Sequence, residues 1–334
     1  MSPRGFLPSL TRLRPSFPRG IPCSSLKSKL IISLALIALA AADLLAGAGG
    51  FSVADGAVLW QLRVPRVLAA VIAGAALSLS GMQMQAVFRN PLADPHIMGV
   101  SSGAGLGAAL AALVMGGAGS AAGGSLALWA FAGASATGGL MIFVSGKVRG
   151  GNTLLLFGVM AGFILSAVSS IVQYSSSEEG LKIFYNWMAG SFAAVGYGEI
   201  AVMGGALVAG VFLALAGAKG MDIILFGDEY SSLRGADPSR IRAVAMLGCC
   251  LMTGAVTAFA GPLGFVGIAG PHIARALSGS SVHRRILPEV LMSGAAMTLA
   301  ADILANVWAT PLPVGSTLAV LGIPVILVIL TKGK

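Results

Sequence analysis

The side chains that could carry out chemistry are few and widely spaced. The closest approach to a nucleotide-binding loop, Ser145-Gly146-Lys147-Val148, lacks the leading glycine and the hydroxyl residue that a phosphate loop requires. The three histidines, His96, His272 and His283, follow no metal-ligand spacing. We interpret them as hydrogen-bonded residues near helix ends or in loops. The sequence therefore predicts a protein that is not an enzyme and binds no cofactor or metal itself.

Ionisable residues within apolar segments are the next candidates, because a charge in hydrocarbon is costly and often functional. The candidates singled out there are Asp43, Arg275 and Asp302. We expect both aspartates near the outer ends of their helices, within reach of water, which favours a structural role over a proton relay. A secondary transporter driven by an ion gradient would need an ion site in mid-membrane. The sequence offers no convincing one, and this class remains the alternative.

The composition indicates what kind of secondary structure must position these residues. Of 334 residues, 56% are hydrophobic and 10% charged, whereas soluble domains carry about 25% charged residues. The apolar runs are long and continuous, which is typical of membrane-spanning helices. We predict an all-α polytopic membrane protein, with a basic cytoplasmic tail at residues 1–29 and one transmembrane domain at residues 30–332. The Arg- and Ser-rich tail also suits a transit peptide, but no clear cleavage site follows it.

Ten crossings account for both the apolar runs and the charges. They are predicted at about residues 30–47, 64–86, 96–115, 124–145, 153–173, 199–217, 241–259, 264–279, 287–305 and 314–331. With both termini in the cytoplasm, eighteen of the 21 Lys and Arg residues lie inside, and Arg63, Arg66 and Lys182 lie outside. The net charge of +9 is thus spread over short loops, which argues against a nucleic-acid partner.

Two loops are predicted to contain short helices. In the outer loop, Ser175 to Gly198, a Ser-Ser-Ser-Glu-Glu opening resembles an N-cap with early acidic residues. In the inner loop, Ala218 to Arg242, Gly227 and Gly235 act as breaks and Asp237-Pro238 marks a helix start. We expect two short helices joined by a turn there, although an ordinary solvated connection would have a similar mixture of charges.

A polar hinge at residues 89–95 separates the second and third crossings. Pro91 and Pro95 prevent a continuous helix. After the hinge, Gly99, Gly103 and Gly107 place a smooth stripe on one helix face, which predicts close packing against another helix.

A short internal repeat connects this region with the second half of the chain. Pro95-His96-Ile97 follows the first hinge, and Pro271-His272-Ile273 occurs five crossings later. An odd number of crossings inverts the second copy, so the sequence predicts two inverted five-helix halves.

Longer motifs extend through most of the chain in a consistent order. They are Arg63-Val64-Pro65-Arg66, residues 88–95 and 99–104, Gly261 to Gly267, Pro271 to Arg275, Ala301 to Leu304 and Leu312 to Gly315. Together they resemble the FecCD family, the type II ABC importer permeases for cobalamin, haem and ferric siderophores. The resemblance implies a permease subunit in the bacterial inner membrane, acting as a homodimer with two ATP-binding ATPase subunits and a substrate-binding protein outside. It leaves open which chelate is carried.

The resemblance also implies three functional sites. The cytoplasmic gate corresponds to Asn90, Pro91, Leu92, Gly151, Asn152 and Thr153. Coupling to the ATPase corresponds to a loop at about residues 218–240, with Gly227, Leu233, Arg234 and Gly235. Docking of the binding protein corresponds to Arg63 and Arg66, for which snorkelling at the membrane surface is the alternative. A third arginine present in some relatives is replaced here by Asn306.

Overall fold

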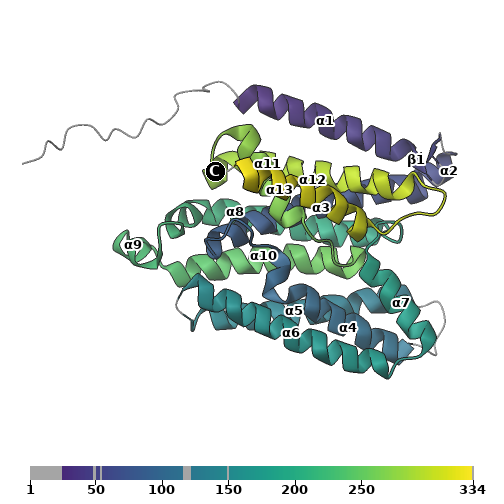
Figure 1. Ribbon diagram of the computed structural model, residues 1–334, viewed down its shortest axis with the longest axis horizontal. Helices are drawn as coiled ribbons and strands as arrows, with labels where there is room; N and C mark the ends of the chain where they lie inside the picture. The colour runs from purple at the N-terminus through teal and green to yellow at the C-terminus, as the bar shows by residue number, and fades with distance from the viewer. Residues whose placement is uncertain (1–24, 48–49, 53–54, 116–121, 149, 333–334) are drawn as a thin grey trace, which may run out of the picture.

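The fold is a bundle of helices that run side by side along the long axis of the molecule (Figure 1). The computed structural model describes residues 25–47, 50–52, 55–115, 122–148 and 150–332. Most of the predicted N-terminal tail lies outside these residues, and the first helix already begins at Ser25. The helices are α1 (Ser25–Leu45), α2 (Gly56–Val58), α3 (Val64–Val87), α4 (Val100–Met115), α5 (Ala122–Ser145), α6 (Gly151–Tyr174), α7 (Glu178–Ala189), α8 (Tyr197–Ile224), α9 (Asp228–Leu233), α10 (Pro238–Ala260), α11 (Val266–Ser278), α12 (His283–Asn306) and α13 (Val314–Lys332).

The polytopic membrane fold is confirmed. Among the described residues, six helical segments are long and apolar enough to cross a membrane, and two shorter ones, Val100–Val114 and Val314–Val328, are also apolar. A helix coincides with each of the ten predicted crossings. The eighth differs in length, because α11 has only 13 residues. At 1.5 Å per residue it is about 20 Å long and cannot cross a hydrocarbon core of about 30 Å alone.

Two breaks interrupt the bundle at corresponding places in the two halves. After α3 the backbone turns at Arg89, which has a positive φ of 50°, and a 3₁₀ turn at Pro95–Met98 leads into α4. Before α11 the chain is irregular from Gly261, and Phe265 has a φ of 70°. Left-handed backbone at a residue other than glycine is uncommon and often marks functional sites. The matching breaks agree with the predicted internal repeat.

Helix α3 is the central element and is buried over almost its whole length. Small residues allow this, because a Cβ atom on Gly81 would collide with the carbonyl of Gly267, and one on Gly74 with the carbonyl of Gly294. The predicted glycine stripe acts in the same way: Gly103 lies against the α5 backbone at Gly133. Helix α10 packs against α3 and α8 and also against α5, which joins the two groups of helices visible in Figure 1.

The two unusual loops lie at opposite ends of the bundle (Figure 1). The outer loop forms α7 as predicted, and its N-cap, Ser177, accepts a hydrogen bond from the Gly180 backbone N–H at 3.2 Å. Ahead of α3, a two-stranded hairpin (β1 Ala46–Gly47, β2 Gly50–Phe51), α2 and a π-helical turn at Leu59–Arg63 extend the same end of the molecule.

The inner loop forms one short helix, α9, where two were predicted. The predicted start at Asp237-Pro238 is confirmed, since the Asp237 carboxylate caps the Ser239 backbone N–H at 2.9 Å. However, this start belongs to α10 itself. The cap leads directly into the apolar segment without a break, so the second short helix is continuous with the crossing that follows.

Candidate functional site

The hinge between α3 and α4 forms a compact turn. The backbone N–H of Asn90 donates to Gln85 at 3.1 Å, and the side chain of Asn90 accepts from the Leu92 backbone N–H at 3.0 Å. Pro91 and Leu92 are exposed at the surface of the turn. The backbone is therefore held in place by Asn90, while the two apolar residues beside it are free to contact other groups.

The second predicted gate segment begins α6 and lies beside this hinge. A Cβ atom on Gly151 would be only 2.6 Å from the carbonyl oxygen of Val87, at the end of α3. Asn152 and Thr153 are exposed. The structure therefore places the two gate segments close together, as the resemblance implies, although it does not test their function.

Two histidines connect the two breaks in the helices. The His96 ring, in the first half, is 2.8 Å from the Leu263 carbonyl oxygen in the second half, through Nε2. The His272 Nε2 atom is 2.9 Å from the carbonyl oxygen of Pro91. Both rings are hydrogen-bonded, as interpreted, but His272 lies inside α11 rather than near a helix end. Sequence analysis did not identify their reciprocal partners, and the repeated Pro-His-Ile motif is the signal that could have suggested them.

Helix α9 projects from one end of the bundle and presents apolar side chains. Leu233, at the end of α9, is 86% exposed, and Phe226, two residues before α9 begins, is 74% exposed. The Arg234 guanidinium lies over the Tyr230 ring, 5.5 Å from its centroid. Gly227 and Gly235 have φ angles of 108° and 75°, conformations that favour glycine and let the chain turn sharply on both sides of α9. Exposed apolar side chains beside charged ones are typical of a protein interaction surface.

An ion-pair chain links α9 to the hinge, and sequence analysis missed it. One Asp228 carboxylate oxygen lies 3.7 Å from Arg89 at the hinge, and the other lies 2.9 Å from Arg242 on α10. Arg89 also lies close to Gly227, whose Cβ would be 3.3 Å from the guanidinium. A single carboxylate thus joins the projecting helix to the segment that contains Asn90. The sequence feature that could have indicated this ion pair is the acidic residue, Asp228, directly after Gly227.

At the opposite end, Arg66 lies in a buried cluster of charges. Its guanidinium is 3.3 Å from Asp43 and 3.0 Å from Asp302. The expectation that water reaches these aspartates is wrong, because Asp43 is 0% and Asp302 1% exposed. Asn306, which stands where some relatives have arginine, donates to Asp302 at 3.0 Å. Burial follows from the packing of α1 and α12 around the start of α3.

Arg63 is also held inside its own chain. Its Nη1 atom donates to the carbonyl oxygens of Leu44 at 2.9 Å and Ser52 at 2.6 Å, and its side chain is largely buried. Neither Arg63 nor Arg66 snorkels into solvent in this structure. Direct docking of a binding protein on these two residues stays a prediction, and the structure assigns them an internal contact that braces the β1–β2 hairpin end.

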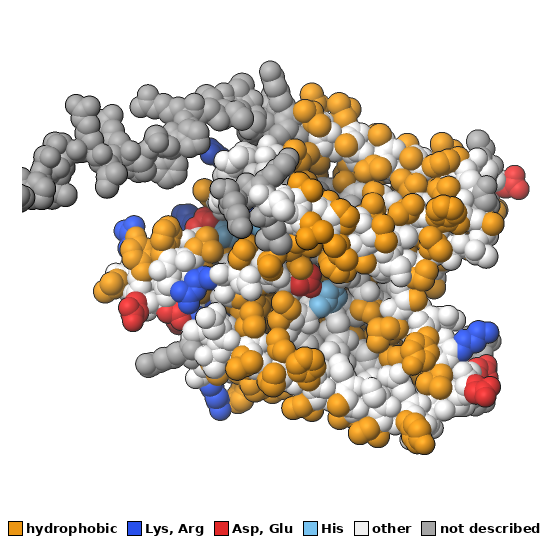
Figure 2. Space-filling model, in the orientation of Figure 1, with side chains coloured by type: hydrophobic (Ala, Val, Ile, Leu, Met, Phe, Trp, Pro, Cys, Tyr) orange, Lys and Arg blue, Asp and Glu red, His pale blue; other side chains and the backbone are white. Residues whose placement is uncertain are grey.

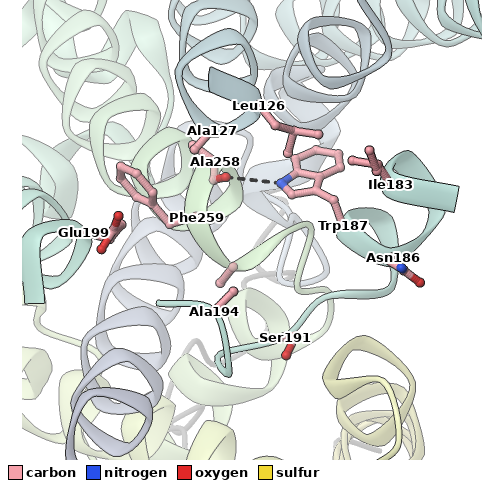
Figure 3. A pocket seen from close by; sticks show the side chains of 11 residues that line it. Leu126, Ala127, Ile183, Asn186, Trp187, Ser191, Ala194, Glu199, Ala258 and Phe259 are labelled. Atoms are coloured by element: carbon pink, nitrogen blue, oxygen red, sulfur yellow. Dashed lines mark hydrogen bonds between the residues drawn. The ribbon is translucent and has the colours of Figure 1, made fainter. Parts of the chain in front are cut away.

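An apolar cavity of about 440 Å³ lies at the α7 end, bounded by α5, α7, α8 and α10 (Figure 3). The Trp187 ring forms one wall, and its Nε1 donates to the Ala258 carbonyl oxygen at 3.2 Å. A smaller groove of about 320 Å³ between α4, α6 and α7 is lined by hydroxyl groups, among them Ser102, Ser166 and Ser170.

The flank of the molecule formed by α6 is apolar and exposed. Phe163, Ile164 and Ile171 are each more than 60% exposed on this helix. Figure 2 shows hydrophobic side chains over the middle of one face of the molecule, while most of its charged groups gather at the two ends. This distribution suits a belt in contact with lipid or with another subunit.

Comparisons with known proteins agree with this geometry. A family model described as the FecCD transport family matches residues 28–332. The chain is 34% identical over 313 residues to the vitamin B12 import system permease protein BtuC of Citrobacter koseri, covering 93% of this chain and 94% of the relative. It is 35% identical over 308 residues to the protein of the same name from Klebsiella pneumoniae, covering 91% and 92%.

Solved structures share the architecture. A metal-chelate type ABC transporter in an inward-facing conformation superposes with a TM-score of 0.83 at 28% identity, covering 92% of this chain and 99% of that one. PsaBC from Streptococcus pneumoniae, in complex with Fab, gives a TM-score of 0.52 at 13% identity over 80% and 90% of the chains, which speaks for the fold alone.

Proposed function

The chain belongs to the FecCD transport family, and on that premise we propose that it carries a metal chelate through the membrane in one step of an ATP-driven import cycle. It is a multi-pass permease of the metal-chelate type. The proposal extends to a homodimer in the bacterial inner membrane, two ATPase subunits and an extracytoplasmic binding protein. ATP binds to the partner subunits, and this chain contributes the pathway.

The observation that carries the proposal is the link between α9 and the hinge. An ATPase subunit can open or close a gate in the permease only if its docking site is energetically coupled to that gate. Here Asp228 lies at the start of the projecting helix and is paired with Arg89, the residue directly before Asn90. The two side chains are partly exposed, Arg89 at 38% and Asp228 at 28%, so this contact is partly solvated.

The mechanism follows from these contacts. When the ATPase subunits bind ATP and close, they displace α9 through Leu233 and Arg234. Asp228 transmits the displacement to Arg89, whose left-handed backbone makes the hinge a point of strain. The hinge in turn is bonded through Pro91 to His272 on α11, so both halves of the subunit move together. Asn90, Pro91 and Leu92 then close or open the pathway with Gly151, Asn152 and Thr153 of α6.

The pathway lies between two copies of the chain in this proposal. Two features of helix α6 favour this position for the pathway. One side of the helix is an exposed apolar face, and the other side has hydroxyl groups, where Ser166 donates to Ser102 at 3.2 Å. Apolar and hydroxyl groups without charge let a large cargo pass without binding tightly. Cobalamin, the cargo named for the relatives, a haem or a ferric siderophore all fit this description.

The orientation is part of the proposal. We place the α9 end in the cytoplasm with both termini, since the positively charged loops lie there. The α7 end then faces outward and receives the binding protein. Arg63 and Arg66 contribute to docking by holding the hairpin end in shape.

Reconstitution tests the function. The chain is incorporated into vesicles with its ATPase and binding protein, and uptake of radiolabelled cobalamin, haem and a ferric siderophore is measured with internal or external ATP. We expect uptake of at least one chelate that requires ATP on the α9 side. Uptake that persists without the ATPase, driven by an ion gradient, would favour a secondary transporter and overturn the proposal.

A further inference from the structure

A cavity of about 330 Å³ lies beside the hinge, between the end of α3, α11 and the start of α12. This volume falls within the lower range of small-molecule sites. Polar side chains from separate parts of the sequence line this one space: Arg89, His272, Arg275, Ser281 and His283. Among the described residues, no aspartate or glutamate lines it.

Arg275 is positioned toward this cavity without being neutralised. Its Nη2 atom donates to the Gln85 side-chain oxygen at 2.5 Å, and the Gln85 amide nitrogen donates to the Gly267 carbonyl oxygen at 3.2 Å. Within the described part of the chain, no carboxylate oxygen lies within 4.0 Å of the Arg275 guanidinium. A partly buried positive charge held by a neutral amide still requires an opposite charge, or water, in the space that it faces.

The charges around the cavity do not balance. Three arginines (Arg89, Arg242 and Arg275) are accompanied by two aspartates, because Asp228 is shared between Arg89 and Arg242, and Asp222 is occupied by His283 at 2.6 Å. Counting only these arginines and aspartates, one positive charge is left over. Since Asp228 is 3.7 Å from Arg89 but 2.9 Å from Arg242, Arg89 is the less fully paired of the two.

We propose that this cavity binds a phosphate group, held between the guanidinium groups of Arg89 and Arg275. Arginine donors match phosphate oxygens in geometry as well as in charge. The Ser281 hydroxyl, which also lines the cavity, can donate a further hydrogen bond. The phosphate is either the headgroup of an acidic phospholipid or a free phosphate ion, and the two share this chemistry.

Binding there would act on the coupling link. A phosphate that engages Arg89 competes with Asp228 for the same guanidinium and ties the hinge to α11 through Arg275. The inference uses only the side chains around the cavity and does not depend on which cargo the protein carries.

The test uses the purified full-length chain in neutral detergent after removal of lipid. Inorganic phosphate binding is measured by equilibrium dialysis with a radiolabel, and retention of phosphatidylglycerol is counted per chain by native mass spectrometry, with phosphatidylcholine as the uncharged comparison. We expect saturable binding of at least one of the two phosphate probes. Arg89→Gln and Arg275→Gln should each weaken it about tenfold or more, since each removes a charge-assisted contact.

Two further variants keep the outcome decisive. Arg285→Gln removes an equal charge from an exposed residue of α12 that does not line the cavity, and should leave binding unchanged. Ser281→Glu places a carboxylate at the exposed rim without disturbing a buried contact, and should weaken binding as strongly as either arginine variant. Retention of phosphatidylglycerol alone identifies the lipid headgroup, and binding of phosphate alone identifies the free ion. Absence of binding for both probes, or an equal loss in Arg285→Gln, would overturn the proposal.

Discussion

The two ends of the bundle use charge in opposite ways. At the α7 end, Arg66 is 9% exposed and lies between two aspartates that are almost completely buried. At the α9 end, Asp228 is partly exposed and pairs with one arginine at 2.9 Å and another at 3.7 Å. A fully desolvated cluster can be broken only at a large cost, whereas a partly solvated pair exchanges partners easily. The comparison indicates one end that holds its shape and one end that moves.

The largest expected effect concerns the rigid end. Arg66→Met would leave Asp43 and Asp302 without their counter-charge, and the free energy of unfolding should fall by about 3–5 kcal/mol. Denaturant titration in detergent measures this. Arg240→Met, at an exposed position near the α9 end, is the control and should change stability by less than about 0.5 kcal/mol.

A compensated variant sharpens the same test. Combining Arg66→Met with Asp43→Asn and Asp302→Asn removes all three charges together, and most of the lost stability should return. If Arg66→Met alone were as stable as the wild type, the cluster would not be what holds this end together.

The second effect concerns the mobile end. Asp228→Asn removes the charge that joins α9 to Arg89, and chelate uptake per ATP hydrolysed should fall about tenfold, equivalent to about 1.4 kcal/mol. Stability should also fall, since the buried Arg242 loses its partner as well, so uptake is compared per folded transporter. Uptake and hydrolysis are measured together in reconstituted vesicles, with Glu229→Gln as the neighbouring exposed control. Unchanged uptake per ATP would mean that the link does not transmit motion.

A smaller effect is expected at the tip of α9. Leu233→Ala combined with Arg234→Glu should weaken binding of the ATPase subunit about fivefold, because an exposed apolar contact of roughly 1 kcal/mol is lost. Affinity is measured by titrating labelled ATPase onto the purified permease. Leu277→Ala, a leucine of α11 that is also exposed, serves as the control. Equal affinities for the two variants would exclude α9 as the coupling contact.

The smallest effect returns to the α7 end. Trp187→Phe keeps the aromatic wall of the cavity in Figure 3 but removes the Nε1 donor to Ala258, so unfolding should become about 1 kcal/mol easier. Transport should remain. A loss of transport without a loss of stability would show that the rigid end also takes part in the cycle.

The positions of helix ends were predictable from local residue types. Ser177 caps α7, Asp237 caps α10, and Pro91 lies in the break after α3, as each residue's chemistry suggests. These rules act over a few neighbouring residues, so the sequence contains all that they need. The ends of α11 lie within two residues of the predicted segment 264–279, but that segment was taken as a full crossing and the helix is too short for one.

The sites were predicted less completely. The family motifs identified Asn90 and Gly151, and the structure brings their segments together at the end of α3. The motifs also pointed to Arg63 and Arg66, but as surface residues. Burial could not be inferred for them, because the groups that bind them belong to α1, the hairpin and α12, and only packing brings these close.

The sequence by itself determined the membrane class, the ten helical segments and the order of the family motifs, since hydropathy and turn chemistry are local properties. The tertiary structure alone decided which charges meet. Asp228 pairs with Arg89, and Arg66 pairs with Asp43 and Asp302, although these residues are distant in the chain. The cost of breaking an ion pair depends on how much water reaches its charged groups, and this exposure is set by the packing of the folded bundle.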